Sequence, residues 1–121
     1  MGLFNFLPER KLSIEAFSAY YHRLPKRIQV SWFRDGKMIV GEVSDGKKRF
    51  MTQGRNADDF IFMVNDALMT IYDIPKEYCE VISRSIRFLP NHREREKLEN
   101  LDVKRSKFGI NKIAEKELVT A

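Results

Sequence analysis

Apolar residues recur every three or four positions in two parts of the chain, which is the spacing of one face of an α-helix. The first part runs from 14 to 24, with Ser13 placed as an N-cap and Pro25 as a stop. The second lies between Asn56, an expected N-cap, and Pro75. The pattern therefore predicts an N-terminal helix and a longer main helix.

Between these helices the chain is rich in β-branched and aromatic residues and is divided by two Asp-Gly pairs. The runs cover 28–33, 38–43 and 48–52, and the Asp-Gly pairs occupy 35–36 and 45–46. Asp-Gly is a strong hairpin signal, because a type I′ turn needs positive φ at both central residues. We therefore expect a three-stranded antiparallel meander. On its first strand, the residues expected to face the core are Ile28, Val30 and Trp32, and those on the other face are Gln29, Ser31 and Phe33.

Two features of these segments predict close packing. Gly41 interrupts the middle strand and marks either a bulge or a close approach of another element. The apolar stripe of the main helix is broader than a surface helix needs, because it is widened by Ile61, Phe62, Met63 and Met69. This helix is therefore either sandwiched between the sheet and another element or in contact with another chain.

The rest of the chain is less regular. Residues 76–90 fit a second helix by spacing but end in a strand-like alternation, and Pro90 closes the segment. Residues 91–121 are strongly charged with sparse apolar positions, and a short helix is expected from Ile110. The expected fold is one α+β domain over 1–90, followed by a charged C-terminal tail. That tail is expected to be loosely held, or ordered by docking on this domain or on a second subunit.

Composition narrows the class of protein. The chain has 121 residues, of which 43% are hydrophobic and 32% charged, as is typical of one globular domain. Its one cysteine, Cys79, excludes an internal disulfide, and no stretch approaches the ~20 apolar residues of a membrane span. A single thiol without a secretory apolar region indicates a cytoplasmic protein that has no membrane partner.

No pattern of residues indicates catalysis, a metal or a cofactor. His22 and His92 lie far apart and have no ligand-type neighbours at metal-binding spacing, and the glycines form no phosphate loop. We therefore expect a protein that is not an enzyme and has no cofactor. A small metal-dependent nuclease is a remote alternative, because it needs converging carboxylates and the predicted strands hold only Glu42 as an interior acid.

The charge suggests a candidate ligand. Twenty-two Lys and Arg against 17 Asp and Glu give a net charge of +5, which suits a nucleic acid or an acidic protein. The candidate nucleic-acid-binding residues are Lys47, Lys48, Arg49, Arg84, Arg87, Lys104, Arg105 and Lys107. Bases would stack on Tyr21, Trp32, Phe33 or Phe50 where these are exposed. Alternatively, basic turns serve only to protect sheet edges from unwanted pairing.

Part of the chain resembles the HicB antitoxin family. The matching residues are Thr52, Gly54, Asn56, Asp58, Asp59, Asp66 and Ala67, and the resemblance spans about 28–74. Ser44-Asp45-Gly46 stands where that family usually has a proline-containing segment. The resemblance implies a non-enzymatic domain of partial ribonuclease-H-like topology that covers a small RNA-cleaving toxin. It also implies, in many members, a C-terminal DNA-binding module.

Two functions follow as hypotheses. The first is a small binding protein of HicB-like shape that acts through protein contact, antitoxin-like or regulatory, as a homodimer. Its candidate partner-binding residues are Phe62, Met69, Phe108, Ile110 and Ile113. The alternative is a nucleic-acid-binding protein that uses the basic hairpin and the tail.

Overall fold

Ser13 and Asn56 cap the two helices that the apolar spacing predicts. The computed structural model describes residues 13–119 of the chain. The Ser13 hydroxyl accepts a hydrogen bond from the N–H of Ala16 at 3.0 Å, and the Asn56 side chain accepts one from the N–H of Asp59 at 2.9 Å. The elements are α1 (Ile14–Arg23), β1 (Arg27–Asp35), β2 (Met38–Ser44), β3 (Arg49–Gly54), α2 (Ala57–Ile71), α3 (Lys76–Ile82), α4 (His92–Glu99), β4 (Arg105–Asn111) and α5 (Glu115–Val119).

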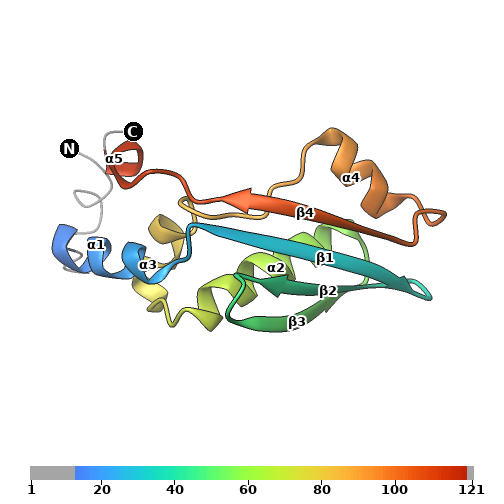
Figure 1. The fold of residues 1–121 in the computed structure, drawn as a ribbon, viewed down its shortest axis with the longest axis horizontal. Helices are drawn as coiled ribbons and strands as arrows, with labels where there is room; N and C mark the ends of the chain where they lie inside the picture. The colour runs from blue at the N-terminus through green and yellow to red at the C-terminus, as the bar shows by residue number, and fades with distance from the viewer. Residues whose placement is uncertain (1–12, 120–121) are drawn as a thin grey trace.

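The described residues form one antiparallel sheet with the strand order β3-β2-β1-β4 (Figure 1). The α+β class is confirmed, but the expected number of three strands is wrong. The fourth strand comes from the charged tail, and it pairs with β1 in a register that sets Val30 opposite Phe108. Since Phe108 and Ile110 turn inward, the tail docks on this same domain and does so as a strand. The helix expected from Ile110 begins only at Glu115.

The first hairpin uses a different turn from the one that its Asp-Gly pair predicts. Asp35 pairs with Met38, so the two central residues of the turn are Gly36 and Lys37. Of these two only Gly36 has a positive φ, of 61°. Positive φ at the first central residue alone matches a type II′ turn, so the expected type I′ turn is wrong here.

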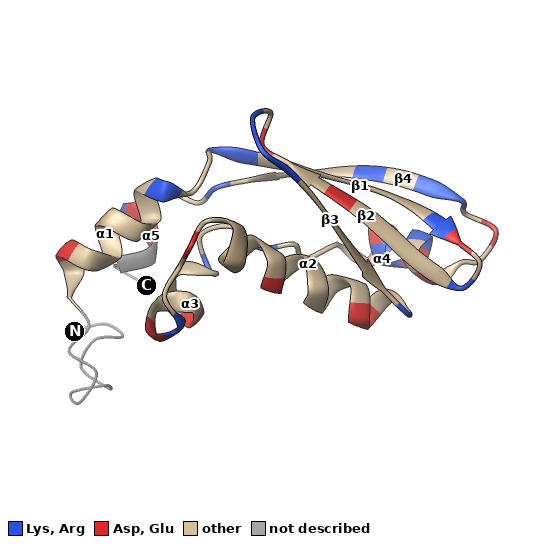
Figure 2. Ribbon diagram, turned by 90° about the horizontal axis from the view of Figure 1, so that it is seen from below, with Lys and Arg blue, Asp and Glu red and all other residues tan. Residues whose placement is uncertain are grey.

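The inner face of the sheet packs on α2, as Figure 2 shows from the side. Ile28, Val30 and Trp32 are buried there, as the alternation predicts. The close approach expected at Gly41 is confirmed, because a Cβ at this position would lie 2.6 Å from ring atoms of Phe60. The opposite face of the sheet carries no helix from the described part of the chain (Figure 2).

The apolar stripe on α2 meets more than one neighbour. One side of the helix packs on the sheet, and residues 83–90, which begin with a turn, lie along another side of it. The side chain of Asn65 hydrogen-bonds the backbone of Phe88, and Met69 is buried in the core. The helix therefore has neighbours on two sides, but Phe62 stays 64% exposed, so contact of this stripe with another chain stays a prediction. The helix expected over 76–90 covers only Lys76–Ile82.

The beginning and end of the described chain meet beside the sheet (Figure 1). The Lys112 ammonium donates hydrogen bonds to the carbonyls of Tyr21 and Leu24 at the end of α1, at 3.3 and 2.9 Å. The Tyr21 hydroxyl donates in return to the carbonyl of Ile113 at 2.6 Å. Burial lowers the pKa of Lys112. These contacts fix the end of β4 to α1.

Residues 1–12 of the expected domain lie outside the described residues. Among the helices of the described part, none has both the length and the apolar composition to cross a membrane.

Candidate nucleic-acid interface

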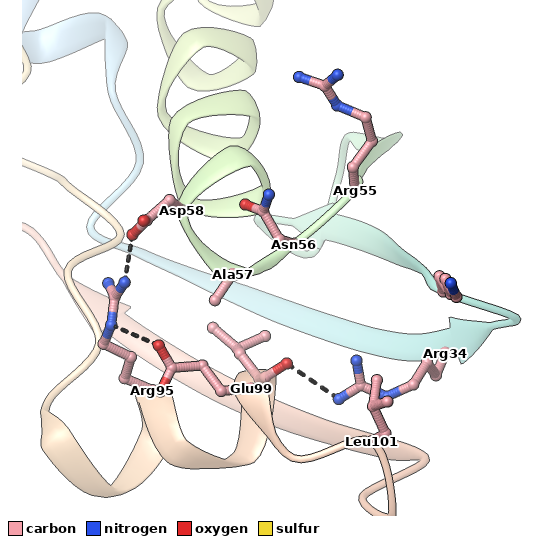
Figure 3. A pocket seen from close by; sticks show the side chains of 10 residues that line it. Arg34, Arg55, Asn56, Ala57, Asp58, Arg95, Glu99 and Leu101 are labelled. Atoms are coloured by element: carbon pink, nitrogen blue, oxygen red, sulfur yellow. Dashed lines mark hydrogen bonds and ion pairs between the residues drawn. The ribbon is translucent and has the colours of Figure 1, made fainter.

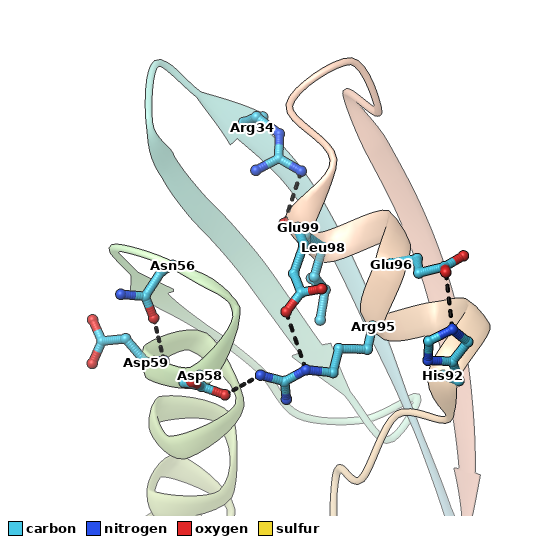
Figure 4. Close-up of polar contacts among 9 residues, drawn as sticks. All are labelled: Arg34, Asn56, Asp58, Asp59, His92, Arg95, Glu96, Leu98 and Glu99. Atoms are coloured by element: carbon cyan, nitrogen blue, oxygen red, sulfur yellow. Dashed lines mark hydrogen bonds and ion pairs between the residues drawn. The ribbon is translucent and has the colours of Figure 1, made fainter.

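Several hollows in the described surface combine charged with apolar side chains. The first, of about 300 Å³, lies where α4 meets the N-terminus of α2 and the β1–β2 hairpin (Figure 3). Arg95 pairs there with Asp58 and, at 3.2 Å, with Glu99 (Figure 4). Arg55 pairs with Asp59 at 3.3 Å, and its backbone N–H bond lowers the pKa of that carboxyl. Arg95 therefore links α4 to the first turn of α2, whereas Arg55 and Asp59 pair locally at the start of α2.

Arg34 is committed to the fold in the same hollow (Figures 3 and 4). Its guanidinium donates to the carbonyls of Leu98 and Asn100 at 3.1 and 3.0 Å, and to those of Lys97 and Val103 at 3.1 and 3.0 Å. A cation among the last carbonyls of a helix stabilises that end. Arg34 thus caps α4 and has little capacity left for a ligand.

The second hollow is a groove of about 610 Å³ on the face of the sheet that points away from α2. Its volume lies within the ~300–1,000 Å³ range of small-ligand sites. Strand register places the outward residues in rows across the sheet. One row is Met51, Glu42, Ser31 and Lys107. The row on one side of it is Gln53, Val40, Phe33 and Arg105, and the row on the other side is Arg49, Ser44, Gln29 and Gly109. We call this surface the open face.

The centre of the open face is apolar. Phe33 on β1 is 48% exposed and Met51 on β3 is 58% exposed, while Val40 between them is half-buried. Phe33 belongs to the outward set that the alternation of β1 predicts. An aromatic ring held on a rigid strand offers a planar surface to a ligand.

Cations flank this centre on both sides. Arg105 and Lys107 project from β4, directly opposite Phe33 and Ser31 in the register. Arg49 lies on β3 at the other edge, and Figure 2 shows the basic positions of β4 and of the β2–β3 hairpin. Within residues 13–119 no hydrogen bond or ion pair engages the side chains of these three cations. They are therefore available to an anionic ligand.

The structure separates the predicted basic residues. It brings Arg49, Arg105 and Lys107 to the open face, whereas Lys47 and Lys48 lie in the hairpin loop beyond it. The ammonium of Lys48 lies 5.3 Å from the centre of the Tyr72 ring, and that of Lys104 donates to the carbonyl of Leu101 at 3.1 Å.

The remaining predicted cations line a different hollow. Arg84 and Arg87 are exposed beside Leu89 and Ile113, around a pocket of about 430 Å³. That pocket lies at the end of β4, and its lining shares no residue with the groove. Sequence proximity to other basic residues therefore does not predict which cations act together.

The predicted partner-binding residues also divide. Met69 is only 7% exposed, and Phe108 and Ile110 face the core, so none of these three forms a free surface. Phe62 is 64% exposed and Ile113 is 43% exposed. Of the four aromatic residues considered for stacking, Tyr21, Trp32 and Phe50 turn inward and Phe33 alone lies on the open face.

Sequence reasoning did not connect Ser31 and Met51 with a site. The alternation of β1 already predicts the outward position of Ser31, and the register of β1 with β2 and of β2 with β3 sets Met51 in the same row. In the described part of the chain, no group of three or more His, Cys, Asp or Glu residues is placed to hold a metal ion. Comparison with family models, curated proteins and solved structures found no match to this chain.

Proposed function

We propose that this chain is a non-enzymatic domain that binds single-stranded nucleic acid on its open face. The observation that carries the proposal is the position of Phe33, exposed at the centre of the sheet with the unpaired Arg105 beside it on β4. An aromatic ring next to free cations matches both parts of a nucleotide, the base and the phosphate.

The energetics favour single strands. A base that stacks on an aromatic side chain contributes about 1–3 kcal/mol, and the base must be unpaired to reach the ring. Phe33 and Met51 supply the surface for stacking. In a duplex the faces of the bases are already stacked on one another, so a sheet surface of this kind gains little from them.

The cations suit the backbone of such a strand. Arg49 on β3 and Arg105 with Lys107 on β4 lie at opposite edges of a four-stranded sheet. With strands about 4.8 Å apart, the two edges are about 14 Å apart, so a chain that crosses the sheet meets cations on both sides of the apolar centre.

The test is binding of short labelled DNA and RNA single strands, measured by fluorescence anisotropy between about 50 and 200 mM salt. We expect Phe33→Ala to weaken binding at every salt concentration. Arg105→Gln with Lys107→Gln should lower the salt slope by about 1.4, at ~0.7 for each phosphate contact. The matched control is Arg84→Gln with Arg87→Gln, which removes two exposed cations elsewhere.

Two results would contradict the proposal. One is that the protein binds no single strand even at about 50 mM salt, where phosphate contacts are strongest. The other is that Phe33→Ala and the β4 double variant bind as tightly as the original protein. Retained binding in those variants with loss in the Arg84 and Arg87 control would move the site to the pocket at the end of β4.

A second candidate is protein binding of the kind that the HicB resemblance implies. The observation that favours it is the position of β3, which pairs only with β2 among the described strands. An edge strand can accept a strand from a second copy of the chain, which would form a homodimer. Light scattering tests this: twice the monomer mass supports the homodimer, and a monomer at high protein concentration contradicts it.

A further inference from the structure

One residue on the open face does not suit a general surface for polyanions. Glu42 lies in the middle of the face, with Ser31 opposite it on β1 and Met51 opposite it on β3. Its side chain is half-buried, and within residues 13–119 no hydrogen bond or ion pair engages its carboxylate. Lys107 stands in the same row of the sheet without pairing with it.

A free carboxylate at this position opposes phosphate. It repels the backbone of a nucleic acid, so a face that bound strands without regard to sequence would gain from a neutral residue here. The carboxylate is an acceptor only, and it can accept two hydrogen bonds side by side. It therefore requires a ligand group that presents donors.

Base edges differ in the donors that they present. Guanine carries two adjacent donors on its Watson–Crick edge, N1–H and the N2 amino group, which a carboxylate can accept in parallel. In adenine and cytosine the amino group lies beside a ring nitrogen that is an acceptor, and in uracil and thymine the N3–H lies between two carbonyl oxygens. Each of those acceptor atoms carries a partial negative charge, so it would repel the carboxylate.

The geometry points to Glu42 as the residue that selects guanine on the open face, which is an inference that rests on the proposed function. Phe33 is opposite Val40, and Val40 is two residues from Glu42 on the same face of β2. Such diagonal neighbours lie ~7–8 Å apart, so a base stacked on Phe33 brings its edge to the carboxylate. The Ser31 hydroxyl beside it can donate to guanine O6.

The test compares three RNA single strands of equal length by fluorescence anisotropy. One is uridine only, the second has isolated guanines, and the third has inosine, which lacks the N2 amino group, in place of each guanine. The original protein is expected to bind the guanine strand about tenfold more tightly than the uridine strand, as a bidentate contact allows. Inosine should lose most of that preference.

The variant Glu42→Gln tests the residue itself. The amide of the variant has only one acceptor atom, so the variant should lose the preference for guanine. It should bind the uridine strand at least as tightly as the original protein does, because one negative charge is gone. Glu42→Asp keeps the carboxylate and should keep part of the preference. Glu80→Gln on the exposed side of α3 is the matched control and should change nothing.

The outcomes separate this inference from the proposed function. Equal binding of all three strands by the original protein, or a preference that survives in Glu42→Gln, would overturn the inference and leave the open face as the binding surface. Failure to bind any of the strands would overturn both. A thermal melt of Glu42→Gln that matches the original protein shows that a lost preference is not a loss of folding.

Discussion

The side-chain amide of Asn65 pairs with the backbone of Phe88 in both directions. Its oxygen accepts a hydrogen bond from the Phe88 N–H at 2.7 Å, and its nitrogen donates to the Phe88 carbonyl at 3.0 Å. The Phe88 ring then packs edge-on against Phe60 of α2 and Phe108 of β4, with centroid distances of 5.8 and 5.4 Å. Asn65 therefore positions the aromatic link between the main helix and the strand that carries Arg105.

Changing Asn65 to Asp should destabilise the fold by about 1–3 kcal/mol, because the new carboxylate cannot donate and faces the Phe88 carbonyl. Urea unfolding measures the change. Asn91→Asp is the matched control, since Asn91 only accepts a hydrogen bond as the N-cap of α4 and Asp serves equally well there. Equal stability of the two variants would show that the Asn65 pairing contributes nothing.

The hairpin between β2 and β3 is fixed to the end of α2 by a hydrogen bond of 2.5 Å from the Tyr72 hydroxyl to Asp45. Burial raises the pKa of Asp45, but hydrogen bonds from the Lys48 N–H, from Tyr72 and from the Lys47 N–H outweigh it, and the pKa lies below its ordinary value. Burial, followed by the bond to Asp45, raises the pKa of Tyr72.

The sign of the Asp45 shift predicts acid sensitivity. A carboxyl whose pKa is lower in the folded state contributes stability above its unfolded pKa of ~3.9 and loses it as the pH falls through the folded value. Tyr72→Phe should cost about 1 kcal/mol at neutral pH and less in acid, where the protonated carboxyl gains less from the bond. Urea unfolding at about pH 7 and about pH 3 tests this; a constant difference would contradict the role of Asp45.

Gly41 should not tolerate a side chain. Because a Cβ there would lie 2.6 Å from the Phe60 ring, Gly41→Ala should destabilise the protein by about 1–3 kcal/mol. The double variant that combines Gly41→Ala with Phe60→Leu should regain part of the lost stability. The contrast is Gly109→Ala, where the crowded neighbour is the flexible end of Arg27 and only a small change is expected. Thermal unfolding compares the variants, and equal effects would contradict the close approach.

Arg34 should control the order of α4. Removal of its guanidinium by Arg34→Met leaves the carbonyls of Leu98 and Asn100 without their donor. Hydrogen exchange of the α4 amides should then quicken while that of the α2 amides stays the same, because α4 is highly charged and buries only Leu98 in the core. Unchanged exchange in α4 would mean that Leu98 and Arg95 suffice to hold it.

The sequence predicted those elements whose signals are local. Ser13 and Asn56 act within one turn of the helices that they cap, and the outward position of Phe33 follows from simple alternation. The strand β4 has only a short local signal, because its inward apolar residues are just Phe108 and Ile110. Its partner β1 lies far away in the sequence. Sheet pairing at that separation depends on the packed core.

The candidate site could be predicted only in part, because the local sequence does not show how β4 pairs. Arg105 and Lys107 are visible as cations in the sequence, as are Arg84 and Arg87. Only the pairing of β4 with β1 sets the first two beside Phe33 and leaves the others at a separate pocket. Local charge alone does not distinguish the two sets.

The most direct test of the open face is an NMR titration of the labelled protein with a short single strand. The largest changes in amide chemical shift should fall on outward positions of the sheet, in particular Ser31, Phe33, Glu42 and Arg105. The amides of α2 behind the sheet should change little. Changes confined to the pocket of Arg84 and Arg87, or no changes at saturating strand, would contradict the account.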